Sequence, residues 1–210
     1  MDSTPTRERF DEAYTSGSAP WVIDQPQPVV VALERDGWIR GAVLDVGCGT
    51  GEHTIALAAL GYDVLGVDVS PAGIDQARAN AAERGVAARF EVGDAFDLGD
   101  MPRYDTVLDS ALFHIFDDDD RARYVRSLQR VVRRGGVVHV LALSDTGPGF
   151  GPQVAETTIL GAFLDGWRLE LLEMRTYRGA VVRPEHAALL RRSIGEHVDL
   201  PAWLARLRRL

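Results

Sequence analysis

The residues of this chain best suited to chemistry form a glycine-rich turn between positions 43 and 52. An apolar run that contains Asp45 leads into the turn, whose residues are Gly47, Cys48, Gly49, Thr50, Gly51 and Glu52. Glycines at this spacing let a backbone turn sharply and approach a ligand closely, as in nucleotide-binding βαβ units. We therefore expect the turn to join a strand to a helix and to bind a nucleotide-like ligand.

Two acidic side chains in this turn discriminate between the possible ligands. The dinucleotide pattern G-x-G-x-x-G needs glycine at position 52, where this chain has Glu52. Asp45 and Glu52 would repel a pyrophosphate at short range, but they suit a nucleoside whose tail carries an ammonium and a sulfonium. S-Adenosylmethionine is such a molecule, so methyl transfer is the leading hypothesis. A nicotinamide-dependent oxidoreductase is the alternative.

Two further acids follow the next strands. Asp68 lies about 20 residues after Gly47, the spacing at which a carboxylate accepts hydrogen bonds from ribose hydroxyls. Asp94 is expected to accept from the adenine amine, while the Ala95 N–H donates to a ring nitrogen. Val69 and Phe96 are expected to enclose the purine. The simpler interpretations, a helix cap for Asp68 and a turn residue for Asp94, remain open.

The elements that must position these residues alternate along the chain from residue 41. Apolar runs predict strands at 42–46, 63–67, 88–92, 104–108 and 137–143, with helices at 52–60, 71–84 and 119–133. This alternation is typical of a doubly wound α/β fold with a parallel sheet. Beyond residue 144 we expect a helix at 154–164, a strand at 167–177 and a helical segment at 184–196. Residues 201–210 fit a strand or a helical turn, and their position favours a final strand.

The chain is expected to form an N-terminal cap, residues 1–40, on a single α/β domain, residues 41–210. The first ten residues contain no apolar run of signal-peptide length, and no stretch reaches the roughly 20 apolar residues of a membrane span. A cytoplasmic protein without a membrane partner is therefore expected. Cys48 is the only cysteine, which rules out an internal disulfide and a cysteine-based zinc site.

Charge and composition narrow the possible partners. The formal net charge is -8 at pH 7, which argues against nucleic acid because that affinity rests on Lys and Arg contacts to phosphate. The acidic run at 117–120 is expected to favour a helix N-terminus, and we predict no metal site. A small-molecule partner and a monomer or homodimer are expected.

Three segments, Leu44–Gly51, Gly66–Ser70 and Gly93–Ala95, resemble motifs of the class I S-adenosylmethionine-dependent methyltransferases. The resemblance covers about residues 41–145. It implies a Rossmann-like, seven-stranded sheet that is mostly parallel with an antiparallel last strand. It also implies S-adenosylmethionine along the strand edge, in contact with Gly47, Cys48, Gly49 and Gly51.

A narrower resemblance concerns the substrate. Phe10-Asp11-x-x-Tyr14, Pro20-Trp21 and residues 109–114 are similar to bacterial small-molecule methyltransferases related to the thiopurine S-methyltransferases. Some relatives in that group methylate heterocyclic or phenolic toxins. By this resemblance Tyr14 and Trp21 would close over the cofactor, and Ser110 would lie beside its methionine end.

Catalysis of methyl transfer requires chiefly in-line positioning and exclusion of water, because the sulfonium already activates the leaving group. His114 is the predicted general base, with a packed, structural histidine as the alternative. Asp109 and Asp145 are expected to orient the substrate or the methionine ammonium. Phe113 and Phe150 are predicted to line an aromatic substrate chamber, and Phe150 lies in a loop that could close as a lid.

The predicted function is therefore methyl transfer to an O, N or S atom of a small aromatic or heterocyclic molecule. A non-catalytic protein that binds S-adenosylmethionine for regulation is a third hypothesis. Such a protein would keep the acids at 45, 68 and 94 but would lack a substrate chamber.

Overall fold

A computed structural model of the chain describes residues 4–210, and one mixed sheet forms its centre. The strands are β1 Ala42–Val46, β2 Asp63–Asp68, β3 Arg89–Val92, β4 Tyr104–Ser110, β5 Val132–Leu143, β6 Trp167–Ala180 and β7 His197–Arg209. The α-helices are α1 Arg7–Thr15, α2 Pro28–Arg35, α3 Glu52–Ala59, α4 Pro71–Glu83, α5 Asp118–Val131, α6 Glu156–Ala162 and α7 Pro184–Leu190. A short 3-10 turn, η1, spans Phe113–Ile115.

The sheet has seven strands in the order β3-β2-β1-β4-β5-β7-β6 within the described part of the chain. Strands β1 to β5 pair in parallel, whereas β7 inserts antiparallel between β5 and β6. The predicted doubly wound α/β class with an antiparallel last strand is confirmed. The choice left open for residues 201–210 is also settled, because β7 pairs with β6 along its length and with β5 over residues 202–208.

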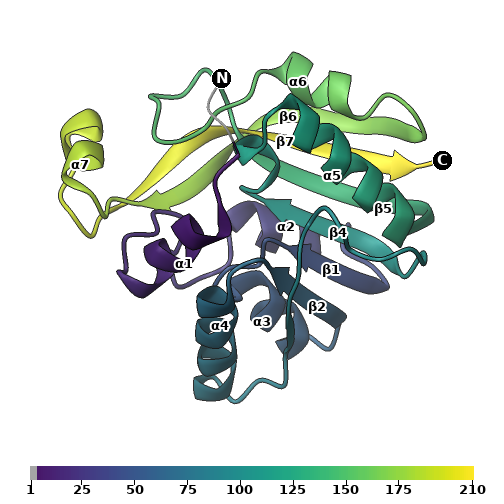
Figure 1. Ribbon diagram of the computed structural model, residues 1–210, viewed down its shortest axis with the longest axis horizontal. Helices are drawn as coiled ribbons and strands as arrows, with labels where there is room; N and C mark the ends of the chain where they lie inside the picture. The colour runs from purple at the N-terminus through teal and green to yellow at the C-terminus, as the bar shows by residue number, and fades with distance from the viewer. Residues whose placement is uncertain (1–3) are drawn as a thin grey trace.

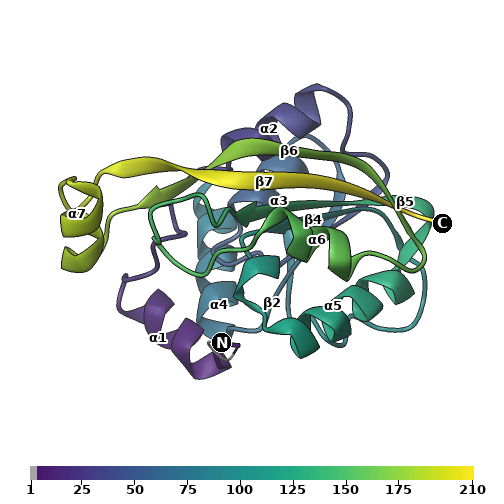
Figure 2. The same ribbon diagram turned by 90° about the horizontal axis from the view of Figure 1, so that it is seen from above.

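Helices cover both faces of the sheet (Figures 1 and 2). Side chains alternate along β1, so Val43 packs in the core beneath α2 and α3, while Leu44 and Val46 pack in the core shared with α5 and α6. Both cores are continuous with β5 and β7. The central strands are therefore buried on both faces, as parallel sheets require.

Several predicted boundaries are wrong. The helix expected to run to residue 133 ends at Val131, and β5 begins at Val132 instead of residue 137, because Val132 already pairs with Tyr104 across an irregular register. The helical segment expected at 184–196 ends at Leu190. Arg191 has a left-handed φ of 52°, which stops the helix and returns the chain to β7.

The N-terminal segment packs on the α/β sheet domain through α1 and the chain that follows it. The Asp11 carboxylate accepts from the Ser70 hydroxyl and from the Ala72 N–H at 3.3 Å, so α1 is tied to the start of α4. Gln27 exchanges two 2.8 Å hydrogen bonds with the backbone of Arg178 in β6.

The domain boundary at residue 40 stays a prediction. No helix among residues 4–210 is both long and apolar enough to cross a membrane.

Gly51, the residue before α3, is required by packing as well as by backbone conformation. Its φ is 87°, and an added Cβ would lie 2.8 Å from the Phe90 ring and 2.9 Å from Ala77. Gly51→Ala is therefore expected to lower the free energy of unfolding by about 2–4 kcal/mol, measured by urea denaturation. Gly61→Ala is the control, because Gly61 also has φ 87° but has no heavy atom within 4 Å of an added Cβ. Equal losses in the two variants would contradict the packing argument.

Candidate active site

A cavity of about 930 Å³ opens at the carboxyl ends of the central strands. Its walls come from the ends of β1, β2 and β4, from α1, and from the loop 149–153 after β5. A smaller cavity of about 40 Å³ adjoins the glycine turn and shares Trp21, Gly47, Ser110 and Tyr177 with the large one. Ligand pockets usually measure roughly 300–1,000 Å³, so the large cavity has room for a nucleoside and a second small molecule.

The glycine turn is held against β2 and under α1. The N–H groups of Gly47 and Cys48 donate to the Val67 carbonyl at 2.7 and 3.0 Å. Gly49 has a φ of 53°, and an added Cβ there would lie 2.8 Å from the Tyr14 hydroxyl. Burial raises the pKa of the Cys48 thiol well above its usual value. Cys48 is therefore an unreactive small residue in a tight turn.

Asp68 lies at the end of β2 on the wall of the large cavity. Its two carboxylate oxygens accept from the Gly49 and Ser70 N–H groups, each at 2.9 Å. Each oxygen keeps a second lone pair that a ribose hydroxyl could use. Ser70 supplies the side-chain cap of α4 by accepting from the Gly73 N–H at 3.0 Å, so Asp68 is not needed for that cap. Burial raises the pKa of Asp68.

Residues after β3 form the adjoining wall. Asp94 is exposed, and its Oδ1 accepts from the Phe96 N–H at 2.9 Å, which leaves Oδ2 without a partner among the described residues. Val69, Ala95 and Phe96 line the same cavity. Asp94 therefore holds a turn with one oxygen and presents the other for a ligand, so the two interpretations of this residue are compatible.

Tyr14 and Trp21 bring the N-terminal segment over the glycine turn. The Trp21 Nε1–H donates to the Tyr14 hydroxyl at 2.9 Å, and the two rings meet edge to face at 5.8 Å. Burial, together with the Asp68 charge, raises the pKa of Tyr14 well above its usual value. Both residues and Ser110 line the large cavity, in the arrangement expected for a cover over a bound ligand.

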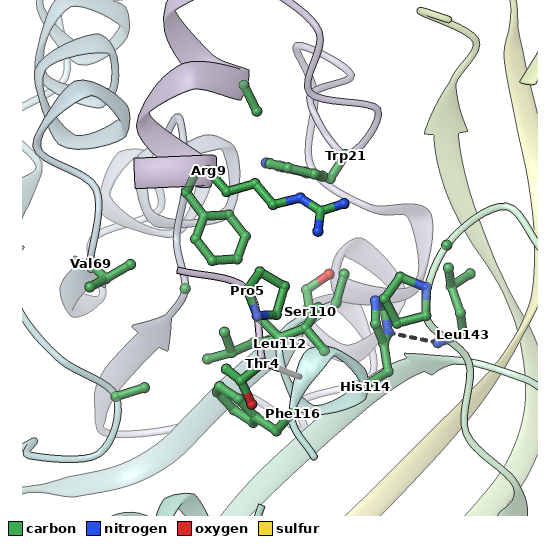
Figure 3. A pocket seen from close by; sticks show the side chains of 18 of the residues that line it. Thr4, Pro5, Arg9, Trp21, Val69, Ser110, Leu112, His114, Phe116 and Leu143 are labelled. Atoms are coloured by element: carbon green, nitrogen blue, oxygen red, sulfur yellow. Dashed lines mark hydrogen bonds between the residues drawn. The ribbon is translucent and has the colours of Figure 1, made fainter. Parts of the chain in front are cut away.

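His114 lies in η1 with its ring on the cavity wall (Figure 3). The Leu143 N–H donates to Nδ1 at 3.0 Å. Because a backbone N–H can only donate, Nδ1 must accept, and the ring proton is on Nε2. Burial lowers the pKa of His114 to about 4. The ring is therefore neutral at pH 7 and has no free lone pair, which argues against the predicted general-base role and leaves Nε2–H as a donor.

Comparison with known proteins places this site in a family. A family model described as "Methyltransferase domain" matches residues 43–136. A solved structure described as "Conversion of a Disulfide Bond into a Thioacetal Group during Echinomycin Biosynthesis" is 38% identical, with a TM-score of 0.87 over 97% of this chain and 92% of that one. An uncharacterised methyltransferase of Schizosaccharomyces pombe is 31% identical over 54% of this chain and 79% of its own. The chain belongs to the class I S-adenosylmethionine-dependent methyltransferases.

A curated Mycobacteroides abscessus relative, named 2-heptyl-1-hydroxyquinolin-4(1H)-one methyltransferase, is 38% identical over 124 residues. That match covers 58% of this chain and 55% of the relative. This methyltransferase therefore spans about half the length of the first curated relatives that it matches.

The residues present fit S-adenosylmethionine, the cofactor of this family. The small cavity beside the glycine turn is lined by Glu52 and His53 but by no lysine or arginine among the described residues. Such a lining suits an ammonium better than a phosphate. Asp68 and Asp94 are available for the ribose and adenine. Each end of S-adenosylmethionine therefore meets side chains that can bind it.

Asp45 lies beneath the glycine turn and supports the residues around it. This corrects the expectation that Asp45 contacts the cofactor directly. Asp45 is 1% exposed and lines neither cavity. It accepts from the Thr54 hydroxyl at 2.7 Å and lies 3.7 Å from Nδ1 of His53. Burial lowers the pKa of His53, but the hydrogen bond and charge of Asp45 outweigh it and the pKa is raised. Gly51 also lines neither cavity, and its role is packing.

Three more expected site residues do not line either cavity of the methyltransferase. Asp109 is 1% exposed and accepts from the Leu112 and Phe113 N–H groups, each at 3.1 Å, and from the Tyr124 hydroxyl at 2.8 Å. Phe113 is fully buried and stacks on Phe163. Asp145 is exposed. Asp109 and Ser110 are neighbours on β4, so their side chains point to opposite faces, and only Ser110 reaches the cavity.

Phe150 does line the large cavity, and the structure adds wall residues that the sequence did not indicate. Tyr177 is buried, lines both cavities and comes from β6, and burial raises its pKa. Arg9, Arg183 and His186 line the large cavity from α1 and the start of α7. The pairing of β6 with β7 positions Tyr177, Arg183 and His186, and the packing of α1 on α4 positions Arg9, so no local pattern marks these residues. Residues 4–210 contain no group of three His, Cys, Asp or Glu side chains placed for a metal ion.

Proposed function

We propose that this protein transfers a methyl group from S-adenosylmethionine to an O, N or S atom of a small aromatic or heterocyclic molecule. The observation that carries the proposal is the continuous cavity of about 930 Å³. The part beside β1, β2 and β3 has the glycine turn, Asp68 and Asp94, whereas the part beside β5 and β6 has Phe150, whose ring lies 4.3 Å from that of His186. A cofactor-binding regulatory protein would not need this additional space.

The names of relatives support this substrate class. They include the hydroxyquinolinone methyltransferase of Mycobacteroides abscessus, at 38% identity, and a ubiquinone biosynthesis O-methyltransferase of Mesorhizobium japonicum, at 32% identity over 146 residues. A probable thiol methyltransferase of Arabidopsis thaliana is 25% identical over 130 residues. These names favour hydroxylated heterocycles, phenols and thiols as the first acceptors to test.

The bound cofactor supplies a methyl group already activated by a sulfonium. Asp68 and the backbone of the glycine turn would hold the nucleoside, and the Tyr14–Trp21 pair would cover it and exclude water. The Nε2–H of His114 would donate to the acceptor and orient its nucleophilic atom toward the methyl carbon. Once the nucleophile is held in line with the methyl carbon and the sulfur, the protein does not need to activate the leaving group.

His114→Ala is expected to lower kcat by at least about tenfold, because it removes an orienting contact beside the acceptor. The Kd for S-adenosylmethionine should change by less than about threefold, because His114 lies apart from Asp68 and Asp94 in the sheet. Steady-state kinetics and calorimetric titration measure the two quantities. His114→Gln is the control, because its side-chain oxygen can still accept from the Leu143 N–H. Equal losses of kcat and cofactor affinity would assign His114 to cofactor binding or folding.

Two measurements test the proposed function. Calorimetric titration with S-adenosylmethionine and with NAD separates a methyltransferase from an oxidoreductase, and tight NAD binding without S-adenosylmethionine binding would overturn the proposal. Release of S-adenosylhomocysteine is then measured with hydroxyquinolines, phenols and thiols. Turnover with any of them supports the proposal, whereas cofactor binding without turnover across the panel favours the regulatory protein.

A further inference from the structure

Two arginines from separate elements line the large cavity, in which the methyl acceptor is expected to bind beside the cofactor. Arg9 comes from α1, and Arg183 directly precedes α7. Figure 1 shows α1 and α7 on the same side of the molecule, and both arginines line the cavity. In Figure 3 the Arg9 guanidinium points into the space between Trp21 and Ser110. Both arginines therefore belong to the wall of the large cavity, and Arg9 lies close to the expected methionine end of the cofactor, where the acceptor must approach the methyl group.

The other charged groups of this cavity are already engaged. Asp118 pairs with Arg121 at 2.5 Å, and Arg7 pairs with Asp11 at 3.7 Å. Asp117 caps α5 by accepting from the Asp120 N–H at 2.9 Å. Asp68 and Asp94 belong to the cofactor end. Within residues 4–210, neither Arg9 nor Arg183 forms an ion pair.

The remaining titratable side chains of the cavity are neutral at pH 7. Burial raises the pKa values of Tyr14 and Tyr177. Burial lowers the pKa of His114 to about 4, and burial together with the charge of Arg183 lowers that of His186. The cavity lining holds four arginines and four aspartates, so its formal charges balance, but Arg9 and Arg183 are its two arginines without an ion pair among residues 4–210.

Neither His114 nor Asp109 can take a proton from a neutral hydroxyl or thiol, so among the described residues only His186, whose Nδ1 has no hydrogen-bond partner, is left on the cavity wall as a neutral base. His114 uses Nδ1 for the Leu143 N–H, and Asp109 is occupied by three donors outside the cavity. A cation within about 4–6 Å of an acidic group favours its anion and lowers its pKa by about 1–3 units. Arginine stays charged at any working pH and also stacks on aromatic faces, so it can bind an aromatic anion without accepting a proton.

We propose that the protein binds its acceptor as an anion, a phenolate, thiolate or N-oxide-like oxyanion, held by Arg9 and Arg183. The inference rests on the proposed function and names the ionic class of its substrate. The acceptor proton leaves to solvent before the transfer. The anionic atom then forms a bond to the methyl carbon while the carbon–sulfur bond breaks, and the electron pair of that bond stays on sulfur. Charge selection thus supplies a nucleophile that is already deprotonated when the methyl group is transferred.

The test uses 4-nitrophenol, whose anion and neutral form absorb at different wavelengths, with the full chain and S-adenosylhomocysteine. At a fixed pH, the anion-to-neutral ratio of the bound probe is expected to exceed that of the free probe by about tenfold, which corresponds to one pKa unit. Arg9→Gln and Arg183→Gln should each reduce this enrichment, and the double variant should abolish it. Arg9→Lys should restore most of it because the charge is kept.

Controls separate this inference from the proposed function. Arg126→Gln removes one positive charge from an exposed position on α5 that lines neither cavity, and it should leave the enrichment unchanged. An unchanged enrichment in the double variant would overturn the inference, as would binding of only the neutral probe or no binding to the wild type. The proposed function fails on a different result, the absence of S-adenosylhomocysteine release with every acceptor, which the absorbance measurement does not require.

Discussion

Asp68→Ala is expected to raise the Kd for S-adenosylmethionine by two to three orders of magnitude. Hydrogen bonds to a charged group contribute about 1.5–3 kcal/mol each, and the predicted contact to the ribose uses two hydroxyls. The variant also leaves the Gly49 and Ser70 N–H groups without their acceptor, so the glycine turn loses its attachment to the end of β2. Calorimetric titration measures the affinity.

Two further variants make this result interpretable. Asp75→Ala removes the same charge from an exposed position on α4 and should leave the Kd unchanged. Asp68→Asn keeps the shape and one carbonyl oxygen, so its loss of affinity should lie between the wild type and Asp68→Ala. A Kd for Asp68→Ala within about threefold of the wild type would contradict the ribose assignment, provided that its melting temperature is preserved.

Asp109→Ala is expected to be less stable than Asp109→Asn by about 3 kcal/mol in urea unfolding. Alanine leaves the Leu112 and Phe113 N–H groups buried without an acceptor, and each such group costs about 1–3 kcal/mol. Asparagine keeps a carbonyl oxygen in the position that accepts from both. Tyr124→Phe removes one of the three donors to Asp109 and serves as the control for the hydroxyl. Equal stability of the alanine and asparagine variants would show that water replaces the carboxylate.

The same residue gives a pH dependence with a definite sign. Burial raises the pKa of Asp109 from 3.8 to about 6, although its three hydrogen-bond donors lower it. The folded state therefore binds the proton more tightly than the unfolded chain. The stability contributed by Asp109 is fully present below about pH 4 and is lost as the pH rises to about 6, by about 3 kcal/mol. Asp109→Asn does not titrate, so its unfolding free energy relative to the wild type should increase across that window.

The cofactor end of the site could be predicted from the sequence because its signals are local. Gly47, Gly49 and Asp68 lie at the ends of strands that the apolar runs already mark, and parallel strands bring their carboxyl ends to one edge. The adenine wall at 94–96 follows from the same rule. The fold class and the cofactor therefore followed from periodicity, glycine spacing and a family resemblance, whereas the strand order came from the structure.

The acceptor end could not be predicted in the same way. Asp109 and Ser110 differ by one position on β4, and only the burial of the strand shows which of them faces the cavity. His114 lines the cavity, but its protonation depends on the Leu143 N–H, 29 residues away. Arg9, Tyr177 and Arg183 reach the chamber from three elements that are distant in sequence.

The sequence by itself determined that a glycine turn joins a strand to a helix, with acids at the ends of successive strands and no pyrophosphate site. These features depend on backbone conformation and on the period of apolar residues, which neighbouring residues set. The tertiary structure alone decided which side chains line the acceptor chamber and which arginines there have no ion pair among the described residues. Both depend on burial and on pairing between distant segments, because a buried group acquires its hydrogen-bond partners and its pKa only when the chain has folded around it.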